Sequence, residues 1–152
     1  MLPRLEADPM HMTTMAPPKL IDWTDQLSVG VPSIDSQHRK LIDLINDLHA
    51  AMAAGRGAEL LGKTFKGLVH YTLSHFAYEE QLMRQTAFPG LEAHRAEHTR
   101  LVDTVQKLQQ DWRSGKVAIS MEMLWFLKDW VGGHIVGMDK KYGPHVTAAG
   151  AR

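Results

Sequence analysis

The placement of proline is the feature of this sequence that most constrains its fold. Four of the seven prolines fall within residues 1–20, and the other three stand at Pro32, Pro89 and Pro144. The stretches 33–88 and 90–143 therefore contain none. Because proline removes a backbone hydrogen bond and clashes inside a helix, long stretches without it are typical of helices. The sequence predicts a chain of long helices, with residues 1–20 as a disordered extension.

Apolar residues in these stretches recur every three or four positions, as in an amphipathic helix. Helices are expected over residues 33–53, 58–86, 91–113 and 118–138, the first capped by Ser33 or Asp35. No segment alternates with the period of a strand. Four helices of about 20 residues joined by short loops predict an all-α, up-down-up-down antiparallel four-helix bundle. It would span residues 21–144 and be followed by a tail, 145–152.

Charge and composition exclude several classes of protein. The chain has seventeen basic and seventeen acidic residues, so we expect no general binding to nucleic acid or to an anionic membrane. It has no cysteine, which excludes disulfides, thiolate zinc sites and iron–sulfur clusters. No apolar run approaches the roughly 20 residues that span a bilayer. We therefore expect a cytoplasmic domain without a membrane span.

Seven of the nine histidines fall within the expected helices. His94 and His98 stand four residues apart, as do His75 and Glu79, so each pair shares one helix face. His38 and His134 are in phase with the apolar stripes of the first and fourth helices. Buried imidazoles and a buried carboxylate are costly without partners, and a metal site in the bundle would satisfy all of them.

The remaining histidines call for no function. His70 lies five residues before His75 and should point away from the ligand face, and His49 lies about three turns beyond His38. His11 and His145 fall in the expected terminal segments.

Two features of the fourth helix depart from a regular pattern. The interval from His134 to Asp139 is five residues, so a wider turn near Gly137 is needed to bring the carboxylate back toward the histidines. Gly132 and Gly133 are unfavourable inside a helix. They indicate either a close helix approach or a comparatively mobile fourth helix.

Four motifs in this order resemble those of the hemerythrin family, above all its single-domain bacterial members, the bacteriohemerythrins. They are Asp35-Ser36-Gln37-His38, His75-Phe76-Ala77-Tyr78-Glu79-Glu80, His94-Arg95-Ala96-Glu97-His98 and His134-Ile135-Val136-Gly137-Met138-Asp139. The resemblance covers about residues 21–144, from Ile21-Asp22-Trp23 to the segment that ends in Tyr142-Gly143-Pro144.

The resemblance implies a non-haem centre of two iron ions. One iron would be bound by His94, His98 and His134, and the other by His38 and His75. Two carboxylates, Glu79 and Asp139, would bridge both irons together with an oxo or hydroxo group. Two octahedral irons need about twelve ligand positions, and this set fills all but one. The open position belongs to the iron with two histidines.

The family also implies the function, which is reversible binding of dioxygen as a hydroperoxide at the open iron. No catalytic residue outside the metal site is expected, so the chain would not be an enzyme. Apolar residues one turn from the ligands could line a dry pocket: Ile42, Met83, Leu101 and Trp130.

Three other functions remain open at this stage. His94-Arg95-Ala96-Glu97-His98 matches the H-x-x-E-H signature of inverzincin proteases, which would use one zinc with Glu97 as the base. A carboxylate-type di-iron oxidase or an iron store is the second, and oxygen or redox sensing is the third. No fused signalling domain is present, which favours a stand-alone, monomeric store or carrier that could serve an oxygen-consuming enzyme.

Overall fold

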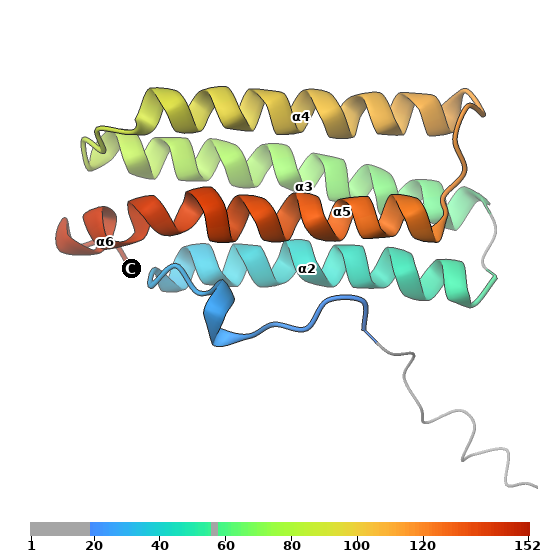
Figure 1. The fold of residues 1–152 in the computed structure, drawn as a ribbon, viewed down its shortest axis with the longest axis horizontal. Coiled ribbons are helices and arrows are strands. Elements are labelled where there is room, and N and C mark those ends of the chain that lie inside the picture. Colours follow the sequence, from blue (N-terminus) through green and yellow to red (C-terminus); the bar gives the residue numbers. More distant parts are fainter. Residues whose placement is uncertain (1–18, 56–57) are drawn as a thin grey trace, which may run out of the picture.

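The fold is a bundle of long antiparallel helices. We analysed a computed structural model of the chain, which describes residues 19–55 and 58–152. The long helices are α2 (Pro32–Ala53), α3 (Ala58–Gln85), α4 (Leu91–Arg113) and α5 (Met121–His134), and they lie side by side with alternating direction (Figure 1). The described part of the chain contains no strand. The predicted all-α, up-down-up-down architecture is confirmed.

The start of the bundle differs from the expectation in one detail. The short 3-10 helix η1 (Asp25–Leu27) precedes α2, and Pro32 occupies the first turn of α2, where a missing N–H is tolerated. Neither Ser33 nor Asp35 caps this helix, because the residue at the N-cap is Val31. The Asp35 carboxylate instead accepts hydrogen bonds from the Val29 N–H and the Ser28 hydroxyl, which fixes the loop before the helix. The predicted extension over residues 1–20 lies almost wholly outside the described residues.

The fourth helix widens after His134, as the five-residue interval to Asp139 predicted. Helix α5 begins at Met121 rather than 118 and passes into a π-helical turn, η2 (Ile135–Asp139). A π turn places residues five apart on one face, so His134 and Asp139 face the same side. Among the described residues, a Cβ atom added at Gly132 or Gly133 would meet nothing within 4 Å, so neither glycine serves a close helix approach there.

The end of the ordered domain was predicted wrongly. Helix α6 (Lys140–Ala148) continues through Pro144, so residues 145–148 are helical and not a tail. Val146 is fully buried, and the His145 ring N–H donates to the Thr86 carbonyl at 2.6 Å. These contacts with the bundle compensate for the backbone hydrogen bond that a proline cannot make.

The core lies between the four long helices and encloses the predicted site. Leu41, Ile45, Phe65 and Leu127 are among its fully or almost fully buried side chains. Eight polar residues of the described part of the chain are also buried, and seven of them are the predicted metal ligands. Among the described residues, no helix combines the length and the apolar character that crossing a membrane requires.

Candidate metal centre

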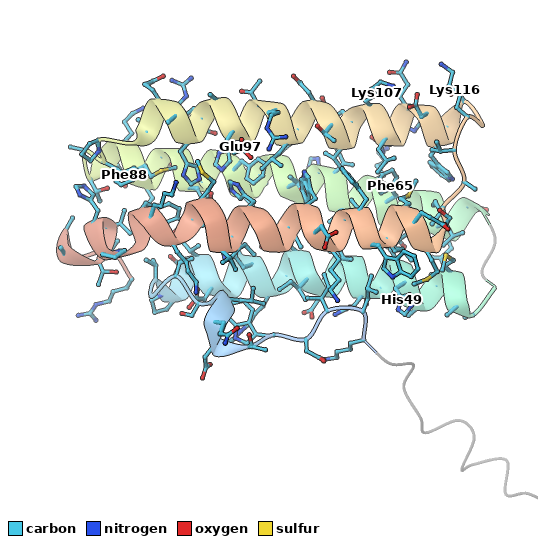
Figure 2. All side chains as sticks on the ribbon, in the orientation of Figure 1. His49, Phe65, Phe88, Glu97, Lys107 and Lys116 are labelled. Carbon is cyan, nitrogen blue, oxygen red and sulfur yellow. The ribbon has the colours of Figure 1, made fainter. Side chains whose placement is uncertain are left out.

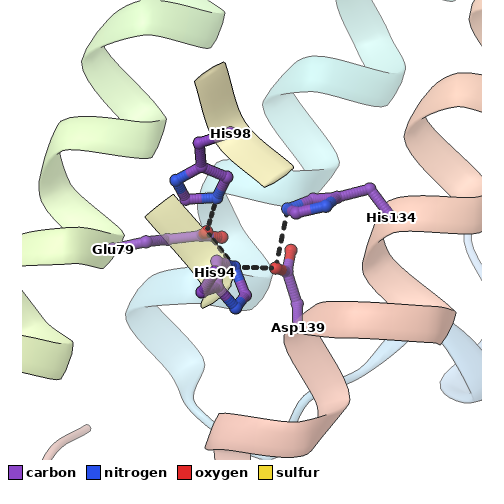
Figure 3. Close-up of side chains that lie close together, drawn as sticks. All are labelled: Glu79, His94, His98, His134 and Asp139. Carbon is purple, nitrogen blue, oxygen red and sulfur yellow. Dashed lines mark ion pairs between the residues drawn. The ribbon is translucent and has the colours of Figure 1, made fainter. Parts of the chain in front are cut away.

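The structure brings all seven predicted ligands together in the interior of the bundle. Helix α2 contributes one, α3 two, α4 two, α5 one and η2 one, in the order His38, His75, Glu79, His94, His98, His134 and Asp139. Each side chain is at least about nine-tenths buried, and the most exposed of them, His134, has 6% of its surface accessible. Figure 3 shows five of them converging from three sides.

The two carboxylates divide the five histidines into a group of two and a group of three. Oxygen Oε1 of Glu79 lies 2.7 Å from His75 Nε2 and 3.1 Å from His38 Nε2. Oxygen Oε2 of the same residue lies 3.0 Å from His98 Nε2 and 3.6 Å from His94 Nε2. One carboxylate thus turns one oxygen toward each group.

Asp139 repeats this division. Its Oδ2 lies 2.9 Å from His38 Nε2, and its Oδ1 lies 2.9 Å from His94 Nε2 and 2.8 Å from His134 Nε2. Two sets of ligand atoms result, and both contain Glu79 and Asp139. The first adds His38 and His75, and the second adds His94, His98 and His134.

Unpaired buried atoms show that this cluster fits metal ions. Nε2 of four histidines, Oε2 of Glu79 and both oxygens of Asp139 are buried and lie close to one another, yet they make no hydrogen bond of acceptable geometry among the described residues. Each such atom costs about 1–3 kcal/mol if it is left unsatisfied. Cations between the two carboxylates would satisfy these atoms, and a donor set of imidazoles and carboxylates suits a transition metal better than Mg²⁺ or Ca²⁺.

The carboxylates and imidazoles of the cluster shift one another's pKa. Burial alone would lower the pKa of His38 and His94, but the adjacent carboxylates of Asp139 and Glu79 raise both to about 9. Burial opposes ionisation of Glu79, yet the surrounding imidazoles hold the pKa of this carboxyl well below its usual range. Metal binding at His38 and His94 would have to displace the protons that these raised pKa values favour.

Three further residues support the ligands, and sequence reasoning did not assign them to the site. The Tyr142 hydroxyl donates to Glu79 Oε1 at 3.1 Å, and burial together with the charges of Glu79 and Asp139 raises the pKa of this phenol, so it stays a donor. Gln37 contacts His75 at 2.7 Å. Phe76 stacks on His98 with ring centroids 3.9 Å apart.

A small apolar cavity adjoins the two-histidine group. Its volume of about 10 Å³ is room for about one water-sized molecule. Leu101 and Trp130, two of the predicted pocket residues, line it, whereas Ile42 and Met83 are buried elsewhere in the core. The rest of its lining was not predicted as pocket: Leu41, Phe76, Val131 and Ile135, together with the ligands His38, His75 and His134.

The other candidate residues lie away from the centre. Glu97 forms an ion pair with Arg100 and is not among the clustered ligands, so the H-x-x-E-H match does not place a base at the metal site. Figure 2 shows His49 on α2 toward the end of the bundle where Phe65 and Lys116 lie. His70 is exposed, as predicted.

Comparisons with known proteins agree with this geometry. The family model described as the hemerythrin HHE cation binding domain matches residues 29–146. A bacteriohemerythrin of Methylococcus capsulatus is 34% identical over 130 residues, which cover 85% of this chain and 98% of that protein. A bacteriohemerythrin of Stenotrophomonas maltophilia is 36% identical, with 85% of this chain and 83% of that protein covered.

Solved structures give the same result. The chain aligns with a crystal structure of wild-type hemerythrin at a TM-score of 0.77 and 32% identity, covering 84% of this chain and 98% of that one. Family match, sequence identity and fold agree over most of the chain. This chain therefore belongs to the hemerythrin family and is of the bacteriohemerythrin type.

Proposed function

We propose that this chain binds dioxygen reversibly at a centre of two non-haem irons and acts as an oxygen store or carrier. The observation that carries the proposal is the division of five histidines into two and three by shared carboxylates. If both irons have the same coordination number, the iron with two histidines has one ligand fewer than the iron with three. A small molecule can bind at that open position. Bacteriohemerythrins and a myohemerythrin from Riftia pachyptila are among the relatives.

When bound, the two irons would supply the electrons and the open coordination position that dioxygen requires. His94, His98 and His134 would hold one iron, His38 and His75 the other, and Glu79 and Asp139 would bridge them. The protonated Tyr142 keeps one oxygen of the Glu79 carboxylate oriented. The form that the bound dioxygen takes stays a prediction from the sequence.

The cavity supports binding over catalysis. It adjoins His38 and His75 and is otherwise lined mainly by apolar side chains. Such a lining would keep water away from a bound dioxygen molecule. The titratable groups in its lining are three imidazoles that would themselves bind metal: His38, His75 and His134. The described lining offers no separate acid or base, so we propose that the cavity serves binding of a small molecule.

The set of ligand side chains argues against a carboxylate-type di-iron oxidase or iron store. Ferritin-like proteins hold their metals with four carboxylates and two histidines, whereas this cluster has two carboxylates and five histidines. Delivery to an oxygen-consuming enzyme, storage and sensing use the same centre and differ in partners. These roles, the monomeric state and the cytoplasmic location stay predictions.

Metal analysis of the purified protein tests the centre. Because the ligands form two sets, we expect about two irons per chain after anaerobic loading with ferrous iron. Iron and zinc should be measured on the same sample, together with hydrolysis of peptide substrates. One zinc per chain with hydrolytic activity would contradict the proposal and favour the protease.

A further inference from the structure

One ligand histidine differs from three of the others in the partner of its outer ring nitrogen. Nδ1 of His75 lies 2.7 Å from the side-chain oxygen Oε1 of Gln37. In contrast, Nδ1 of His38, His98 and His134 is buried without a hydrogen-bond partner among the described residues. Gln37 is therefore a specific contact of one ligand and not a general feature of the cluster.

The identity of the contacting atoms determines which nitrogen of His75 carries the proton. An amide oxygen only accepts hydrogen bonds, so Nδ1 must be the protonated nitrogen of a neutral His75. Its Nε2 then carries the lone pair, and this atom points into the cluster, 2.7 Å from Glu79 Oε1. A metal ligand needs this tautomer, and the hydrogen bond also fixes the orientation of the ring.

The charge of the side chain beside the outer ring nitrogen distinguishes His75 from His98. Gln37 is neutral, and it immediately precedes His38, the other histidine of the same group, on α2. Near the three-histidine group, the Glu80 carboxylate lies 3.5 Å from His98 Nδ1, while its other oxygen accepts a hydrogen bond from Arg95. An anionic neighbour makes an imidazole a stronger electron donor than a neutral one does.

We infer that Gln37 is a positioning residue for the metal held by His38 and His75. It keeps His75 in the metal-binding tautomer, and its neutral amide limits the electron density that His75 gives to this metal. The inference rests on the proposed two-metal centre. It assigns to Gln37 an effect on metal affinity at one site and on the reduction potential of the centre.

Two substitutions separate these effects. Gln37→Leu removes the acceptor at similar size, and Gln37→Glu keeps an acceptor but makes it anionic. Gln106, which is exposed on α4, provides matched controls as Gln106→Leu and Gln106→Glu. All four variants and the wild type are loaded with ferrous iron and titrated with a chelator, and the reduction potential of each is measured.

Gln37→Leu should weaken retention of one of the two irons by about 10–100-fold and leave the other unchanged. Gln37→Glu should restore most of this affinity and shift the reduction potential to a more negative value, with faster autoxidation. Circular dichroism and thermal unfolding show whether a variant has simply failed to fold. If Gln37→Leu does not fold, the reduction potential measured for Gln37→Glu still tests the role of Gln37.

Equal retention of both irons in Gln37→Leu, or an unchanged potential in Gln37→Glu, would overturn the inference. A wild type that never holds two irons would contradict the proposed function instead, so the two failures are distinguishable. The proton on His75 gives an independent readout in the zinc-loaded protein. Its Nδ1–H resonance should be protected from exchange in the wild type and lost or fast-exchanging in Gln37→Leu.

Discussion

Replacing Glu79 by alanine should give a folded chain that retains neither iron. Each oxygen of this carboxylate faces a different group of histidines, so one substitution removes a ligand from both metals at once. It also leaves the remaining buried imidazoles with a single carboxylate, Asp139, to balance the positive charge. Iron per chain, measured after gel filtration, should fall from about two to near zero.

Glu92→Ala is the matched control for this substitution. The Glu92 side chain is 82% exposed on α4, and its partner is the surface residue Arg95. This variant should keep both irons and its thermal stability. If Glu79→Ala kept two irons, the carboxylate would not be shared between the metals, and the assignment of the bridge would be wrong.

Replacing His75 by alanine should remove one iron and leave the other. His75 belongs to the two-histidine group, whose iron would keep one imidazole, whereas the three-histidine group keeps its full set. The site beside the apolar cavity would be lost with that iron. Binding of azide, a small anion that should compete with dioxygen at the open position, should disappear with it and can be followed by visible absorption.

His70→Ala provides the control on the same helix. His70 lies five residues before His75 and is exposed, so it should affect neither iron content nor azide binding. Loss of iron in the His70 variant, or full azide binding by His75→Ala, would contradict the placement of the open site.

Local periodicity was sufficient to predict the long helices and to place most of the candidate ligands on inward faces. The i, i+4 spacing of His94 and His98 places both on one helix face, and the five-residue interval to Asp139 predicted the wider turn that η2 forms. Such features depend on residues close in sequence, so the sequence contains them. The resemblance then supplied the assignment of ligands to two metals.

Contacts between helices could not be predicted in the same way. Gln37 meets His75 and Tyr142 meets Glu79 only because of how α2, α3 and α6 pack, which no local pattern determines. The cavity shows the same limit. Three residues after His38, Leu41 lines the cavity, whereas Ile42, one position further, does not.

Helix α6 shows tertiary contacts overriding a local signal. Gly143 and Pro144 are common where helices end, yet burial of Tyr142 and Val146 favours a helix that continues to Ala148. Gly143 is required for another reason, because any larger residue would collide with the Val29 carbonyl.

A reversible oxygen cycle followed by visible absorption tests the proposed function most directly. The protein is loaded with iron, reduced without oxygen and should be nearly colourless. Admitting oxygen should produce a visible absorption band and a red solution, and lowering the oxygen pressure should return the original spectrum over repeated cycles. Irreversible conversion to a stable diferric form in the first cycle, with oxygen consumed, would contradict reversible binding and indicate an oxidase.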